Sequence, residues 1–227
     1  DYYASRGLGD VYKRQEDAQR YTSFSKNVKE AFRKTFMRED GMSMLPADIA
    51  RMVDPMAVMM GMAKEPHIEG NDPVEENTQT SYVLPLQFNM LNGTLKQRVA
   101  EKLHQAVADA GYTLTTGFIG TPGICTVLTD NGYNEDAYRL ITQTEYPSWL
   151  FTVKQGATTM WERWNSYTKE NGFGPDAMNS FNHYSYGAIE EWMISRCLGI
   201  ERDEQHPGYK HFVLRPEPGK AFNYAKG

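Results

Sequence analysis

Cysteine, strong net charge and long apolar runs are all scarce in this sequence. Its 227 residues contain two cysteines and carry a formal net charge of -5. Because no basic stripe is present to neutralise phosphates, the composition argues against a nucleic-acid-binding protein. No apolar run approaches the roughly 20 residues that a transmembrane helix needs. The first residues, "DYYASRGLGD", also lack the basic-then-apolar pattern of a signal peptide.

Several motifs that bind metals or activate nucleophiles are missing as well. The sequence has no H-E-x-x-H pattern and no pair of histidines that we interpret as zinc ligands. It has no G-x-S-x-G nucleophile elbow and no phosphate-binding P-loop. We interpret Cys125 and Cys197 as buried thiols, because both lie in apolar helical segments. The sequence therefore predicts neither a metal nor a cofactor, and it assigns no role to His67, His104, His206 or His211.

Apolar residues recur mostly at helical spacing, within the balanced composition of one globular core: 40% hydrophobic and 23% charged residues. The face Tyr21, Phe24, Val28 and Phe32 is one example. Helices are predicted from Asp17, over about 46–61, over about 74–91 with a kink or restart at Pro85, from Leu95 to a stop at Gly111, from Thr121-Pro122, after a cap at Asn134, from Pro147, and over about 180–198.

The predicted helices are joined partly by long loops rich in glycine and aromatic residues, "GYTLTTGFIGTPG" and "ENGFGPDAMNS". We expect these loops to gather at one end of the helical layers, where sites usually form. The last predicted helix is apolar on nearly every side, which is typical of an inner, fully buried helix. Residues 1–15 are interpreted as a disordered or non-native leader, 16–200 as the helical domain, and 201–227 as the start of a β-domain that includes a strand at Phe212–Leu214.

The stretch "TTMWERWN" places one carboxylate, Glu162, between Trp161 and Trp164. Indole rings lie against the C–H faces of sugars, and glycoside hydrolysis needs a pair of carboxyl groups, so Glu162 fits one half of such a pair. The alternative is a structural ion pair between Glu162 and Arg163. His183, expected in the first turn of the last helix, could stay neutral there and bind a ligand hydroxyl, or it could simply be a buried histidine bonded to backbone.

Six blocks, read in order, strongly resemble one family. They are "TQTSY" at 78–82, "LTTGFIGTP" at 114–122, "AYRLITQTEYPSWLF" at 137–151, "QGATTMWERW" at 155–164, "MNSFNHYSYGAIEEWM" at 178–193 and "PGYKHFVLRPEPG" at 207–219. The family is that of the bacterial α-L-rhamnosidases, glycoside hydrolase family 78, and the blocks are similar to the C-terminal half of its catalytic domain. The resemblance covers about residues 17–219.

The resemblance implies an all-α fold, a partial (α/α)6 toroid of the six-hairpin glycosidase type, with a C-terminal strand leading into a truncated β-sandwich. It implies an inverting mechanism in which Glu162 is the general base, with His183, Trp161 and Trp164 in the sugar pocket. The family's general acid lies in an upstream Asp-Glu-Arg motif that this sequence lacks. We therefore expect a fragment of a rhamnosidase that is inactive alone and that depends on the remainder of the parent catalytic domain.

The expected substrate is a rhamnose-containing glycoside or polysaccharide, with no nucleic acid, membrane or cofactor involved. The compartment stays open between cytoplasm and a secreted or periplasmic location in a bacterium. Two other functions also stay open. A sugar epimerase could use the same helical toroid, although His183 has no second histidine at a matching place. A non-catalytic carbohydrate-binding module is the other alternative, and it would not need the charge of Glu162.

Overall fold

The fold is described from a computed structural model, which defines residues 14–52, 70–203, 205–206 and 208–226. The chain divides into two compact units. One unit consists of Asp1–Asn77 and Met90–Leu95, and the other of Thr78–Asn89 and Lys96–Gly227. Among the described residues, no helix combines the length and the apolar character needed to cross a membrane.

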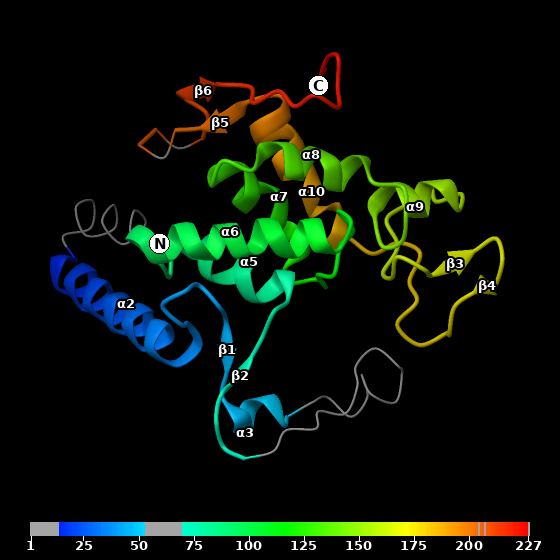
Figure 1. The fold of residues 1–227 in the computed structure, drawn as a ribbon. Coiled ribbons are helices and arrows are strands. Elements are labelled where there is room, and N and C mark those ends of the chain that lie inside the picture. The colour runs from blue at the N-terminus through cyan, green and yellow to red at the C-terminus, as the bar shows by residue number, and fades with distance from the viewer. Residues whose placement is uncertain (1–13, 53–69, 204, 207, 227) are drawn as a thin grey trace. The chain divides into compact units, whose positions relative to one another are not determined.

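The first unit begins with the long helix α2 (Gln15–Phe36), which starts two residues before the predicted Asp17 (Figure 1). Acidic residues lie in its first turn and basic residues in its last turn, which is the arrangement that the helix dipole favours. Its predicted apolar face is not covered, since Tyr21, Phe24 and Val28 are all exposed. The periodicity thus predicted the helix correctly, but it did not predict that the apolar face of the helix is exposed.

The described part of the first unit also contains a short antiparallel pair, β1 (Met44–Leu45) with β2 (Val74–Glu75), and the one-turn helix α3 (Ala47–Ala50). The helix predicted over 46–61 is confirmed only in that turn, because residues 53–69 lie outside the described part. The helix predicted from Val74 is wrong at its start. Val74 and Glu75 pair with Leu45 and Met44, and this partner from elsewhere in the chain holds them extended.

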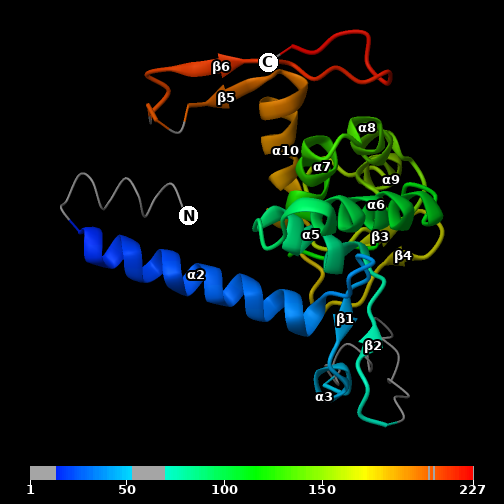
Figure 2. The same cartoon turned by 60° about the vertical axis from the view of Figure 1, so that its left-hand side comes forward.

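The second unit contains most of the helices (Figures 1 and 2). Its central element is α7 (Thr121–Asp130), which contacts α5 (Gln79–Gln87), α8 (Asn134–Thr142) and α10 (Ile189–Trp192). The remaining helices are α6 (Gly93–Asp109), of which the part from Lys96 belongs to this unit, and α9 (Trp149–Lys154). Seven of the ten residues of α7 are buried, so the core of this unit forms around it.

Local signals set most helix ends in this unit. Thr78 and Ser81 form a reciprocal capping box at the start of α5, and α5 continues through Pro85 without restarting. Gly111, with a φ of +64°, follows the end of α6 as predicted. The predicted start of α7 at Thr121 is also confirmed, with Pro122 in its first turn.

The cap predicted at Asn134 is wrong. Tyr133 stands at the N-cap position of α8 without a side-chain bond, and Asn134 is already the first helical residue. The Asn134 side chain instead donates to the carbonyl of Glu217 (3.3 Å) and accepts from Thr129 Oγ1 (3.1 Å). The Asn134 side chain therefore bonds to a residue 83 positions later in the sequence, whereas the local pattern predicted that it caps its own helix.

The single buried helix predicted over 180–198 is also wrong. Helical structure begins only at Ser185, five residues after the predicted start. The preceding part of the chain contains a hairpin of β3 (Tyr167–Thr168) and β4 (Gly172–Phe173). From there a 3-10 turn η1 (Ser185–Ala188), α10 and a π-helical turn η2 (Met193–Cys197) follow one another. Trp192 is buried in this run, whereas Met193 and Ile194 are each 40% exposed, so the run is buried on one side only.

The predicted strand is confirmed as β6 (Phe212–Leu214), and its antiparallel partner β5 (Ile200–Arg202) lies in the same chain. Figure 2 shows both strands beside one another, beyond the end of α10. The register pairs Arg202 with Phe212 and Ile200 with Leu214. Residues of β6 are exposed, as expected for a two-stranded ribbon whose outer face is not covered.

Candidate functional site

Glu162 is held by a second segment of chain that runs beside it. The amide of Glu162 donates to the carbonyl of Ser180 (2.9 Å), and the amide of His183 donates to the carbonyl of Met160 (2.8 Å). The carboxylate of Glu162 accepts from the amide of Ser180 through Oε2 (2.8 Å). These three bonds bring residues 160–162 and 180–183 together, in a part of the chain where helical structure begins only at Ser185. The half-buried Glu162 therefore has one carboxylate oxygen fixed by the backbone.

Both tryptophans that flank Glu162 are buried, at 6% and 7% exposure. Trp161 meets Phe181 edge to face, with ring centroids 5.2 Å apart. Trp164 stacks on Tyr186 at 3.9 Å and meets Trp149 edge to face at 5.6 Å. The two indoles thus fix the segment that carries Glu162, and one face of Trp164 is covered by Tyr186.

His183 lies before the helical run and not in its first turn, so the helix-dipole argument for a neutral imidazole does not apply. A different contact selects one tautomer of the ring. The amide of Ser185 donates to His183 Nδ1 (3.3 Å), which leaves the ring proton on Nε2. The half-buried ring is also stacked on Phe118 (4.7 Å) and on Tyr184 (5.4 Å). His183 can therefore present an N–H donor from a ring that is held in place.

Two residues that connect this site, Phe118 and Tyr186, were not predicted from the sequence. Phe118 contacts both His183 and Tyr186, and Tyr186 stacks on Trp164, so a continuous row of rings runs from His183 to Trp164. The carbonyl of Tyr186 also accepts from Trp149 Nε1 (2.9 Å). Burial raises the pKa of Tyr186 to about 12, with smaller influences from Tyr146, Arg163 and Glu162. The aromatic letters in "GFIG" and "YSYG" were the available signal, but neither stretch indicates which ring it meets.

The ion pair between Glu162 and Arg163, left open as a structural alternative, does not form within the described part of the chain. Arg163 Nη1 is instead buried there without a hydrogen-bond partner, and Asn179 Oδ1 is buried in the same condition. The Asn179 amide group donates to the carbonyl of Ser166 (3.1 Å). Arg163 follows the Glu162 segment and Asn179 precedes the 180–183 segment, so a buried polar atom without a protein partner lies beside each of the two segments.

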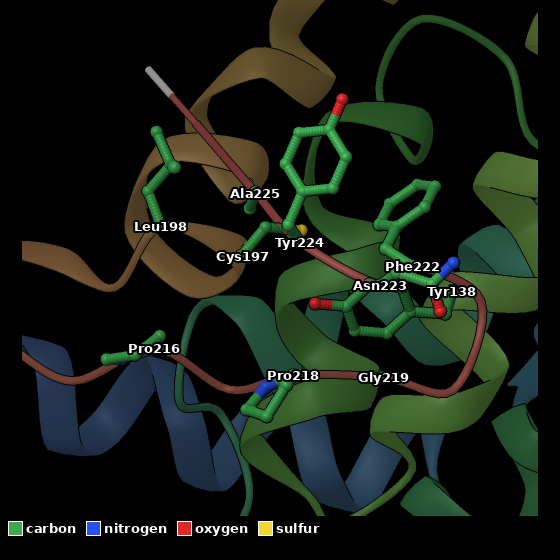
Figure 3. A pocket seen from close by; sticks show the side chains of 10 residues that line it. All are labelled: Tyr138, Cys197, Leu198, Pro216, Pro218, Gly219, Phe222, Asn223, Tyr224 and Ala225. Carbon is green, nitrogen blue, oxygen red and sulfur yellow. The ribbon is translucent and has the colours of Figure 1, made fainter.

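A hollow of about 290 Å³ lies elsewhere in this unit, between α8, η2 and the C-terminal segment (Figure 3). Tyr138, Cys197 and Phe222 line it, and the Tyr138 hydroxyl donates to the carbonyl of Glu217 (2.9 Å). Neither Glu162 nor His183 contributes to this hollow. Cys125 and Cys197 are buried free thiols, as predicted. Burial raises the pKa of both, which makes their thiolates scarce at neutral pH.

The model of the bacterial α-L-rhamnosidase six-hairpin glycosidase domain matches residues 5–197. The chain belongs to this family. An α-L-rhamnosidase of Streptomyces avermitilis is 41% identical over 153 residues, which cover 67% of this chain and 15% of that protein. An α-L-rhamnosidase of Alteromonas sp. is 35% identical over 212 residues, which cover 93% of this chain and 20% of that protein. The resemblance drawn from the six sequence blocks is thus confirmed.

A solved structure supports the same assignment. The crystal structure of the S. avermitilis α-L-rhamnosidase complexed with L-rhamnose aligns with a TM-score of 0.71 and 32% identity, over 96% of this chain and 18% of that chain. The predicted fold class, a largely helical part of a six-hairpin glycosidase domain with a strand at its end, is therefore confirmed. The chain spans about a fifth or less of the length of these relatives.

Proposed function

We propose that this chain is part of an inverting α-L-rhamnosidase and that Glu162 is the general base of its reaction. The observation that carries the proposal is the carboxylate of Glu162, held at one oxygen by the Ser180 amide, on a segment fixed by two buried indoles. That segment runs directly beside the one that carries His183. The membership of the chain in the rhamnosidase family supports the same role.

The two oxygens of Glu162 have different tasks in this mechanism. Oε2 accepts from the Ser180 amide, which fixes the orientation of the carboxylate. Oε1 has no hydrogen-bond partner among the described residues, so it can take a proton from water. As that proton moves to Oε1, the water oxygen bonds to the anomeric carbon of an α-L-rhamnosyl unit and the bond to the leaving oxygen breaks.

The leaving oxygen takes its proton from a general acid on the opposite face of the sugar. We place this acid in the remainder of the catalytic domain, so we expect the 227-residue chain alone to hydrolyse no rhamnoside. An inverting site needs the two carboxyl groups about 6.5–9.5 Å apart, with the water between them. The role of Glu162 is thus to supply one side of a site that the rest of the domain completes.

His183, Trp161 and Trp164 form the proposed sugar-binding part of the site. His183 offers Nε2–H to a sugar hydroxyl, because its Nδ1 already accepts from Ser185. Its stacking between Phe118 and Tyr184 limits rotation of the ring, so the donor direction is set before the sugar arrives. Trp161 and Trp164 border this part of the site in our proposal and also hold Glu162 in place, because most of their surface is packed against the protein.

The test uses a chimeric enzyme in which this chain replaces its matching segment in the S. avermitilis relative. The Glu162→Gln variant keeps an oxygen that accepts from Ser180 but loses the base, so kcat on an aryl α-L-rhamnoside should fall by about 10²–10⁴-fold. The matched control is Glu170→Gln, because Glu170 is an exposed carboxylate in the turn between β3 and β4. This control should keep the activity of the unsubstituted chimera.

Proton NMR of the first product separates the remaining possibilities. Inversion at an α-glycoside should release β-L-rhamnose before the anomers equilibrate. Release of α-L-rhamnose first would contradict the inverting mechanism, and full activity of Glu162→Gln would contradict the assigned base. Conversion of free rhamnose into an epimer, without hydrolysis of the rhamnoside, would favour the epimerase alternative.

A further inference from the structure

Three potential metal ligands meet at the end of the β5–β6 ribbon, away from the residues of the proposed sugar site. Asp203 directly follows β5 and His211 directly precedes β6. Because Arg202 pairs with Phe212, Asp203 and His211 form the next opposed pair of the ribbon. The intervening turn adds His206, whose amide donates to the carbonyl of Asp203 (3.0 Å). The fold of the ribbon thus brings together residues that lie up to eight positions apart.

Both imidazoles turn the same ring atom toward one carboxylate oxygen. His206 Nδ1 lies 2.8 Å and His211 Nδ1 lies 2.7 Å from Asp203 Oδ2. One potential ligand atom from each of the three residues can be chosen so that all lie within 4.8 Å of one another. Among the described residues, this is the group of histidine, cysteine and acidic side chains whose geometry could hold an ion.

The remaining contacts orient the carboxylate and leave the imidazoles accessible. Asp203 Oδ1 accepts from the amide of Gln205 (2.9 Å), a contact of the kind that fixes ligating carboxylates from outside the coordination shell. The side chains of His206 and His211 are 59% and 64% exposed, whereas that of Asp203 is 22% exposed. Water can therefore reach the imidazoles and complete the coordination of an ion held between them.

Two imidazoles and one carboxylate suit a borderline-soft divalent ion better than Mg²⁺ or Ca²⁺, which prefer oxygen ligands. Zinc bonds of about 2.0–2.2 Å place tetrahedral ligand atoms about 3.3 Å apart. The two N···O separations would have to open by about half an ångström, which rotation of exposed side chains can supply. Each imidazole would then donate the lone pair of Nδ1 to the ion and carry its proton on Nε2.

We propose that Asp203, His206 and His211 form a binding site for one Zn²⁺ or a similar imidazole-preferring divalent ion. The ion would join His206 to the two strand ends at Asp203 and His211 and would hold the ribbon closed. This site is independent of the proposed hydrolysis, because none of its ligands belongs to the Glu162 segment. The sequence pattern does not indicate this site, since Asp203 and His211 become neighbours through the pairing of β5 with β6.

The test is calorimetric titration of the 227-residue chain with ZnCl₂, and with MgCl₂ for comparison. One Zn²⁺ per chain should bind, and Mg²⁺ should not. The variants His206→Ala and His211→Ala should each weaken Zn²⁺ binding by at least about tenfold, because each removes one of three protein ligands. The control His104→Ala removes a described histidine whose Nδ1 contacts Asp136, outside the cluster, and should leave the affinity unchanged.

A second measurement avoids any effect of substitution on folding. Co²⁺ added to the unsubstituted chain should give visible absorption bands of an ion with imidazole ligands, and Zn²⁺ should remove them by competition. The proposal fails if the unsubstituted chain binds no Zn²⁺. It also fails if both histidine variants, folded as judged by circular dichroism, bind Zn²⁺ as tightly as the unsubstituted chain does.

Discussion

Replacing Trp192 with phenylalanine should destabilise the second unit, because this indole is both packed and hydrogen-bonded. Trp192 is 1% exposed and meets Tyr138 edge to face at a centroid distance of 5.0 Å. Its Nε1 donates to Thr129 Oγ1 (2.9 Å), which joins α10 to α7. Phenylalanine keeps one aromatic ring in the site but cannot donate this bond.

The expected loss can be worked out from these contacts. The hydrogen bond contributes about 1 kcal/mol to the free energy of unfolding. The smaller ring leaves roughly 40 Å³ unfilled, which at about 24 cal/mol per Å³ costs about 1 kcal/mol more. Thr129 Oγ1 still donates to Asn134 Oδ1 (3.1 Å), so its hydroxyl is not left without a partner. Trp192→Phe should therefore lower the free energy of unfolding by about 2 kcal/mol.

Urea unfolding followed by circular dichroism measures this loss as a lower midpoint with an unchanged slope. The control Met193→Ala changes the next residue, which is 40% exposed, and should cost less than Trp192→Phe. A double-mutant cycle of Trp192→Phe with Thr129→Val should give a coupling energy of about 1 kcal/mol. Equal losses for Trp192→Phe and Met193→Ala would refute the one-sided burial of this helical run, and a coupling near zero would refute the bond to Thr129.

Two further predictions concern Tyr186 and Gly199. Because burial raises the pKa of Tyr186 to about 12, the unfolded chain loses this proton first as the pH rises above about 10, so stability should fall between pH 10 and 12. Urea unfolding from pH 9 to 11 measures how steeply the free energy of unfolding falls with pH. Tyr186→Phe should make this fall less steep, whereas Tyr184→Phe, at a position 86% exposed, should not change it. An equal fall in both variants and in the unsubstituted chain would contradict the burial of Tyr186. At Gly199, φ is +71° and an added Cβ would lie 2.0 Å from the backbone nitrogen of Pro216, so Gly199→Ala should lower the melting temperature. Gly111→Ala is the control, because Gly111 has a similarly strained φ of +64° but no atom within 4 Å of an added Cβ. If Gly111→Ala lowered the melting temperature as much as Gly199→Ala, the predicted clash with Pro216 would be contradicted.

The elements that the sequence predicted well are those whose signals are local. The start of α7 at Thr121 needs only the proline that follows it, and the end of α6 needs only Gly111 at a positive φ. The strand at Phe212–Leu214 follows from three consecutive apolar residues between turn residues. Each of these signals acts within a few residues, so no knowledge of the rest of the fold was required.

The predictions that failed were overridden by distant partners. Asn134 bonds to Glu217 and not to its own helix, and Val74 pairs with Leu45. Hydrogen bonds between residues 160–162 and 180–183 hold the second segment in place, and the last helical run begins only at Ser185. Periodicity reports which face of a segment is apolar, but a contact between distant segments decides whether that face forms a helix at all.

The sequence alone indicated that this chain is largely helical, because its apolar residues recur at helical spacing. The six blocks in order placed it with the α-L-rhamnosidases and, with the two tryptophans beside Glu162, singled out Glu162 and His183 as the residues to consider. Tertiary structure alone decided how Ser180 fixes the Glu162 carboxylate, how Phe118 and Tyr186 connect His183 with Trp164, and how Asp203, His206 and His211 meet. The reason is physical: hydrogen bonds and ring contacts act over a few ångströms of space, and folding brings within that range residues that are far apart in the chain.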